Sequence, residues 1–171
     1  MLRSFHRASL GGGWLGCAGL GLFALMLALP AGAQNKGDAS VKSRLDARGL
    51  KYEVDNDGDF KVTYSYSKEG RTQLVFVSGG TESVGGFQIR EVFSPAARVD
   101  KDRIDGRKAL ELMVESRKNK LGSWELAGDV LYFVVKLPDS MDAAQLESAM
   151  DIAAQTADDM ELEISGDRDD L

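Results

Sequence analysis

The sequence predicts an α+β domain in which helices pack on one face of an antiparallel sheet. Segments with alternating apolar and polar residues follow one another through tight turns, which is typical of antiparallel hairpins. Helix-like segments flank these runs instead of alternating with each strand, so the helices should be segregated from the sheet. The predicted order is one helix, four strands, one helix, two strands and a final helix.

The first elements follow a polar linker at residues 34–39. A short helix should span residues 40–48, with Ser40 as its N-terminal cap. Residues 51–66 alternate around the turn Asn56-Asp57-Gly58, which predicts a β-hairpin.

The middle of the chain continues the sheet. Residues 74–77 are apolar on both faces, so this strand should be central. Two Gly-Gly pairs at residues 78–86 predict a loop, and residues 87–93 predict a fourth strand whose apolar face is interrupted by Glu91. Residues 94–106 have the composition of turns.

The last part predicts a helix over residues 107–120, two strands and a final helix. The middle helix has one apolar face at helical spacing, formed by Leu110, Met113, Val114 and in part Arg117. Trp124, on the first of these strands, should pack in the core or on a sheet face, and a ligand platform is the alternative. Asp139 or Ser140 should cap the final helix, and the acidic end at residues 166–171 should be a solvated tail.

The first 33 residues have the order of a secretory signal peptide. Arg3 and Arg7 precede an apolar stretch, and Ala31-Gly32-Ala33 supplies small residues where signal peptidase requires them. We therefore expect cleavage after Ala33 and a periplasmic or secreted protein. Two alternatives are an uncleaved membrane anchor, which would be the protein's only contact with the membrane, and a lipoprotein signal at Cys17. The second fits poorly because the apolar core follows the cysteine.

Cleavage would leave 138 residues (171 minus 33), which suits one domain with a proper core. That chain would have 19 basic and 27 acidic residues, a net charge of −8, so nucleic acid is not an expected partner. It would also lose His6 and Cys17, the only histidine and the only cysteine. Disulfides, histidine-based triads and the common zinc sites are then excluded.

Two motifs resemble catalytic or metal sites without meeting their requirements. Ser65 and Lys68 have the S-x-x-K spacing, but they end a strand at a turn instead of opening a helix. Asp55, Asp57 and Asp59 alternate as in a calcium loop, but that loop needs glycine and glutamate where this chain has other residues. We expect no cofactor, no metal and no enzyme activity. A hydrolase or sugar-binding protein that uses carboxylates alone is the alternative.

A family resemblance covers residues 40–165. The run from Arg48 to Val62 resembles the opening helix and hairpin of the YbjN family, also called bacterial sensory transduction regulators. The strand Leu131 to Pro138 followed by a helix is similar as well. The resemblance implies a fold like that of the dimeric type III secretion chaperones, and a binding or scaffolding domain without catalytic residues. The family's Asn-Trp-Asn signature is absent, since Lys118-Asn119-Lys120-Leu121 stands in its place.

The strand over residues 130–137 carries the candidate partner site. One of its faces belongs to the core and contains Leu131, Phe133, Val135 and Leu137. The other face contains Val130, Tyr132 and Val134, and leaving this apolar face in water is unfavourable. We therefore expect it to bind another protein, and a second copy in a homodimer in particular. The alternative is that a helix or the linker covers it within the monomer.

Overall fold

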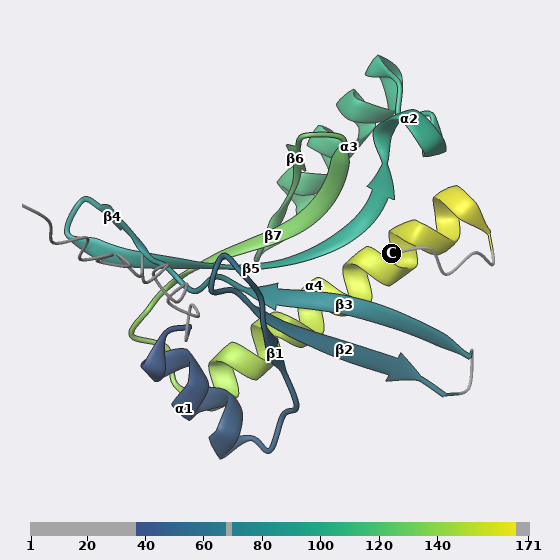
Figure 1. Ribbon diagram of the computed structural model, residues 1–171. Helices are drawn as coiled ribbons and strands as arrows, with labels where there is room; N and C mark the ends of the chain where they lie inside the picture. Colours follow the sequence, from purple (N-terminus) through teal and green to yellow (C-terminus); the bar gives the residue numbers. More distant parts are fainter. Residues whose placement is uncertain (1–36, 68–69, 167–171) are drawn as a thin grey trace, which may run out of the picture. The chain divides into compact units, whose positions relative to one another are not determined.

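The computed structural model describes residues 37–67 and 70–166 (Figure 1). The chain divides after Ala33 into two units, and the description concerns the second. The expected signal peptide at residues 1–33 and the acidic tail after Gly166 lie outside the described residues. The described elements are α1 (Ala39–Ala47), β1 (Glu53–Val54), β2 (Phe60–Tyr66), β3 (Arg71–Val77), β4 (Glu82–Val84), β5 (Phe87–Arg98), α2 (Val99–Asp102), α3 (Gly106–Lys118), β6 (Ser123–Ala127), β7 (Val130–Pro138) and α4 (Ala143–Ser165).

The strands form one antiparallel sheet in the order β1-β2-β3-β5-β7-β6, and β4 pairs with β5 outside this path. The predicted hairpin is confirmed, because β1 and β2 flank a turn in which the Gly58 amide donates to the Asp55 carbonyl (3.2 Å). The central position of β3 is also confirmed, since it lies between β2 and β5.

The domain begins earlier than the predicted linker allowed. A Cβ added to Gly37 would lie 2.5 Å from Cζ of Phe60, so this glycine already packs on the core. Asp38 caps α1, because its Oδ1 accepts hydrogen bonds from the amides of Ser40 (2.8 Å) and Val41 (3.1 Å). The predicted cap at Ser40 is therefore wrong: Asp38 reaches the free amides of the first turn, and Ser40 lies inside the helix.

Two further boundaries differ from the prediction. The predicted loop at residues 78–86 contains β4, which returns through Gly85 and Gly86, both with positive φ. The region 94–98, predicted as turns, extends β5, and its register shifts between Pro95 and Ala97. Pro95 has no backbone N–H to donate to a neighbouring strand. The bulge allows this proline inside a long strand, because the regular hydrogen-bond ladder is interrupted there.

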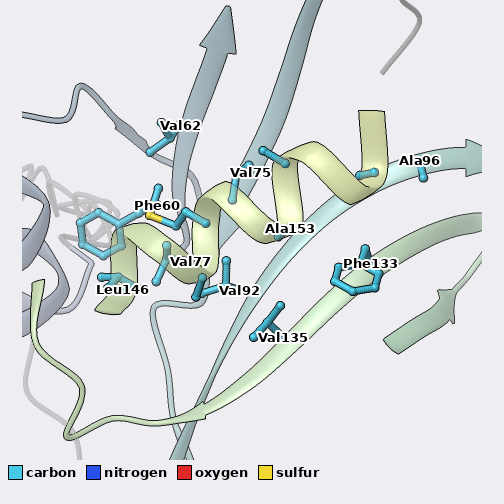
Figure 2. Close-up of a cluster of buried hydrophobic side chains, with 14 of the residues drawn as sticks. Phe60, Val62, Val75, Val77, Val92, Ala96, Phe133, Val135, Leu146 and Ala153 are labelled. Atoms are coloured by element: carbon cyan, nitrogen blue, oxygen red, sulfur yellow. The ribbon is translucent and has the colours of Figure 1, made fainter. Parts of the chain in front are cut away.

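The core lies between the sheet and the helices (Figure 2). Buried residues of α1, α3 and α4 join the same cluster as one face of the strands, so these helices share one side of the sheet. Small residues on α4 allow the helix to approach β3, β5 and β7; they are Ala149, Ala153, Ala154 and Ala157. Trp124 belongs to this core, as predicted. Within the described residues, no helix has the length and apolar character needed to cross a membrane.

Buried charges hold α4 at both ends. Two carboxylates in its C-terminal half contact Arg71 of β3. Arg71 Nε lies 3.0 Å from Asp158 Oδ1, and Arg71 Nη2 lies 3.0 Å from Glu161 Oε2. Before its start, Asp139 Oδ1 accepts from Arg90 Nε (2.7 Å) and Arg44 Nη2 (2.8 Å).

The loop before α4 also corrects the predicted cap. The hydrogen bond from Arg90 lowers the pKa of Asp139, and Arg44 lowers it further. Asp139 is thus engaged in the charge network and does not cap α4. Asp142 does, in a capping box with Gln145, so the prediction of Asp139 or Ser140 is wrong by two or three residues.

Candidate protein-interaction surfaces

The structure places Val130, Tyr132 and Val134 together on the sheet face opposite the helices. Their neighbours in the chain, Leu131 and Phe133, are buried in the core as predicted. Val134 is only 6% exposed although it lies outside the core cluster, while Val130 and Tyr132 are half-buried. Val134 is therefore covered, and Val130 and Tyr132 remain the accessible members.

Aromatic side chains dominate the centre of this helix-free face. The rings of Phe76 and Phe93 are stacked, with centroids 5.2 Å apart and planes 8° apart. Tyr132 meets Phe93 edge to face at 5.7 Å. The register explains the grouping, because Phe76 pairs with Phe93 across β3 and β5, and Phe93 pairs with Val134 across β5 and β7. All three rings are half-buried, so they form a partly accessible apolar surface.

A charged group borders these rings. Lys136 Nζ lies 2.8 Å from Glu125 Oε2 and 3.5 Å from Glu91 Oε1. The hydrogen bond to Glu125 is the main cause that raises the pKa of Lys136. Glu91, which interrupts the apolar pattern of β5 in the sequence, therefore has a charged partner on β7. The face thus has an aromatic centre and a polar border, the arrangement common in protein interfaces.

The second surface lies on α3 and was not predicted as a partner site. Leu110, Met113 and Val114 are 65%, 68% and 60% exposed. The helix attaches to the core through Leu112, which is buried, and through Ser116, whose Oγ accepts from the Trp124 amide (2.9 Å).

Two more exposed leucines belong to the segments that follow α3. Leu121 (46% exposed) lies in the connection to β6, and Leu126 (61%) lies on β6, which packs against α3. Leu121 also lines the groove along α4. We call Leu110, Met113 and Val114 the α3 patch. Their helical spacing was visible in the sequence, but spacing alone does not show whether an apolar face meets the core or the solvent.

A groove of about 510 Å³ runs along the first half of α4. Apolar side chains such as Leu137, Met141 and Ile152 line much of it. Asp142 is the ionisable residue in the lining of the groove. Its carboxylate caps α4 by accepting a hydrogen bond from the Gln145 amide (2.8 Å). The groove therefore offers an apolar surface without a free catalytic group.

The two motifs rejected from the sequence have structural roles where they are described. Asp55 Oδ1 accepts hydrogen bonds from the amides of Asp57 (2.9 Å) and Asp59 (3.0 Å), so its carboxylate stabilises the turn. No group of three or more potential metal ligands exists in the described part of the chain. Ser65 is an exposed residue of β2, and Lys68 lies outside the described residues.

Comparison with known proteins adds a likeness in fold. No family model matches the chain, and no curated protein matches it in sequence. A chain of the HopA1-SchA chaperone-effector complex is similar with a TM-score of 0.51 and 8% identity, over 71% of this chain and 89% of that one. A chain of the Yersinia pestis type III secretion chaperone SycH in complex with a YscM2 fragment gives a TM-score of 0.48 and 13% identity, over 75% and 98%. The first likeness, together with the antiparallel sheet and its helices, confirms the predicted chaperone-like α+β fold.

Proposed function

We propose that the protein is a non-enzymatic protein-interaction domain of the bacterial envelope that forms a homodimer. The observation that carries this proposal is the α3 patch, which leaves three large apolar side chains of one helix in water. Exposing apolar surface is unfavourable by roughly 25 cal/mol per Å², so a partner that covers the patch gains this free energy. The sequence placed self-association on Val130, Tyr132 and Val134, but the α3 patch is the more exposed of the two apolar surfaces.

A second copy suits the α3 patch because a two-fold axis sets one apolar stripe against an identical one. Leu110, Met113 and Val114 occupy neighbouring turns of one helix, so two such helices can interdigitate their side chains. The flanks of the stripe carry both signs of charge, including Arg107, Lys108, Glu111, Glu115 and Lys118. Each flank therefore offers groups of either sign to the other copy.

The helix-free face is the proposed surface for a different protein. Tyr132 combines an apolar ring with a polar hydroxyl, which is typical of residues that anchor interfaces. Val130 lies on the same face of β7, and Val134 is buried there. The likeness to a chain of the HopA1-SchA chaperone-effector complex is consistent with a binding role, since that complex joins two proteins.

Export and the lack of enzyme activity belong to the same proposal. The signal-like first 33 residues support the envelope location, and N-terminal sequencing of the exported form should begin at Gln34. The two buried carboxylates of the described residues, Asp158 and Glu161, are both bonded to Arg71, which disfavours a hydrolase that uses buried acids. Membership of the YbjN family stays a prediction.

Light scattering on matched variants tests the dimer. We expect a dimer for the wild type, a folded monomer for Met113→Asp, and a dimer for Tyr132→Asp, because only the first charge falls on the α3 patch. Circular dichroism should show that both variants stay folded. If Tyr132→Asp gives the monomer and Met113→Asp does not, the second copy lies on the helix-free face. A wild type that is monomeric at high concentration would contradict self-association altogether.

A further inference from the structure

Among the described residues, one edge of the sheet is open over most of β2. β1 is only two residues long and pairs with Phe60 and Lys61. Beyond Lys61, no described strand pairs with the outer edge of β2 as far as Ser65. Thr63 and Ser65 are exposed, although β3 pairs with both of them on the inner side.

The hydrogen-bond pattern shows which backbone groups face outward. In an antiparallel ladder, residues that bond to one neighbouring strand alternate with residues that bond to the other. The Asp55 amide donates to the Asp59 carbonyl (3.0 Å), so the odd-numbered residues direct their backbone groups toward β1. Thr63 and Ser65 therefore direct their N–H and C=O groups away from β3, where no described strand meets them.

The other edge of the sheet is protected, which makes this opening unusual. On β6, the Trp124 amide is bonded to Ser116 Oγ of α3, so a helix covers that edge. Prolines, bulges and charged side chains usually prevent an edge strand from pairing with another chain. Residues 62–65 of β2 contain none of these features. Val62-Thr63-Tyr64-Ser65 also has a composition that favours strands.

We propose that this open edge, residues Val62–Ser65, binds an extended segment of another polypeptide as an added antiparallel strand. Backbone hydrogen bonds to Thr63 and Ser65 would supply the pairing, as in other cases of strand addition. The inference rests on the proposed function as a protein-interaction domain. It uses a surface distinct from the α3 patch and from the helix-free face.

The charges beside the edge define the segment that fits. On the helix side, the Tyr64 hydroxyl donates to Asp151 Oδ1 of α4 (2.9 Å). Burial is the main cause that raises the pKa of Tyr64, and the hydrogen bond to Asp151 raises it further. Of the six acidic residues of α4, four form ion pairs with Arg48, Arg71 or Lys108, and the exposed Asp151 is the carboxylate that contacts Tyr64. A segment with lysine or arginine on the helix side is therefore favoured.

The same charges disfavour a second copy as the occupant. Two copies joined through their β2 edges around a two-fold axis perpendicular to the sheet would keep their helix sides on the same side. The exposed Asp151 of each copy would then approach the other across the new strand pair. Like charges in this arrangement repel, whereas a basic segment is attracted.

A peptide of alternating valine and lysine, ten residues long, is the probe. Mixed with the protein produced from the full chain, it should slow amide hydrogen exchange at Thr63 and Ser65 at least tenfold. The same peptide with a central proline should bind at least tenfold more weakly, because proline removes a donor. A valine-glutamate peptide should also bind at least tenfold more weakly. Equal binding of all three peptides would overturn the inference.

Variants of the protein provide an independent test. Thr63→Pro should fold, because the N–H that it removes has no partner in the sheet, and it should weaken peptide binding at least tenfold. Thr63→Ala keeps that N–H and should bind within twofold of the wild type. Ser65→Pro repeats the test at the second outward residue. If both proline variants unfold, or if both bind the peptide as well as the wild type does, the outward groups have been misassigned and the inference fails.

Three outcomes separate this inference from the proposed function. If the exchange at Thr63 and Ser65 slows with protein concentration alone, a second copy occupies the edge and the inference is wrong. If the valine-lysine peptide does not bind while Met113→Asp still converts a dimer to a monomer, the edge inference fails and the proposed dimer stands. If the peptide binds and the wild type is monomeric, the opposite holds.

Discussion

The helices α3 and α4 both have one apolar face, yet they use it in opposite ways. α4 buries most of its apolar residues against three strands, and Leu146, Met150 and Ala153 are fully covered. α3 holds to the core mainly through Leu112 and leaves Leu110, Met113 and Val114 in solvent. The difference shows that an apolar stripe at helical spacing identifies a helix and its apolar face. It does not show whether this face meets the core or the solvent.

The attachments of the two helices also differ in chemistry. α4 is held by a capping box at its start and by Asp158 and Glu161 on Arg71 near its end. α3 has the side-chain contact of Ser116 with the Trp124 amide and the ion pair of Lys108 with Glu163. Variants that weaken each attachment should therefore destabilise the domain through α4 much more than through α3.

The largest effect is expected at Arg71. Arg71→Met should lower the free energy of unfolding by about 3–5 kcal/mol, because Asp158 and Glu161 would be left buried without their cation. Urea denaturation measures this loss. A triple variant that also replaces Asp158 and Glu161 by leucine should recover most of the stability, since it removes the buried charges as well. A loss below about 1 kcal/mol for Arg71→Met would show that this network does not hold α4.

The next effect compares equivalent leucines on the two helices. Leu146→Ala in α4 should cost about 2–5 kcal/mol, because it leaves a cavity in the core. Leu110→Ala in α3 should change the free energy of unfolding of the isolated subunit by no more than about 0.5 kcal/mol, since that side chain is 65% exposed. Denaturation at low protein concentration measures both. Equal losses would mean that α3 is packed in the folded subunit.

A smaller effect tests the cap of α4. Asp142→Ala should cost about 1 kcal/mol, because it frees the Gln145 amide at the helix start. Ser140→Ala serves as the control, since the sequence also allowed Ser140 as the cap, and it should change stability by less than about 0.5 kcal/mol. If Ser140→Ala instead lowers the melting temperature more than Asp142→Ala does, Ser140 is the cap, as the sequence predicted.

The smallest effect concerns acid. The hydrogen bond from Ser40 is the main cause that lowers the pKa of Asp38 from 3.8 to about 2, and the hydrogen bond from Arg90 lowers that of Asp139. A carboxyl with a lowered pKa stabilises the folded state above its unfolded pKa, and the contribution is lost as the pH falls through the folded pKa. The free energy of unfolding should therefore fall between about pH 4 and pH 2. The fall should be smaller in Asp139→Asn, and denaturation at both pH values measures it.

Local chemistry made most of the fold predictable. Alternation in β2 and β7 and the Asp57-Gly58 turn identified the strands and the hairpin, because side-chain period and turn conformation depend on adjacent residues. The core side of β7, with Leu131, Phe133 and Val135, was predicted for the same reason. The extension of β5 through Ser94 and Pro95 was missed, because the pairing with β7 overrides the turn-like composition there.

The sequence by itself determined the antiparallel α+β class, the two faces of β7 and the absence of histidine and cysteine after residue 33. Only the tertiary structure decided that Val134 is covered, that the apolar stripe of α3 faces solvent, and that β2 has an open edge beside Asp151. The physical reason is range. Periodicity and turns are set by neighbours in the chain, whereas burial and edges depend on contacts between residues far apart in it.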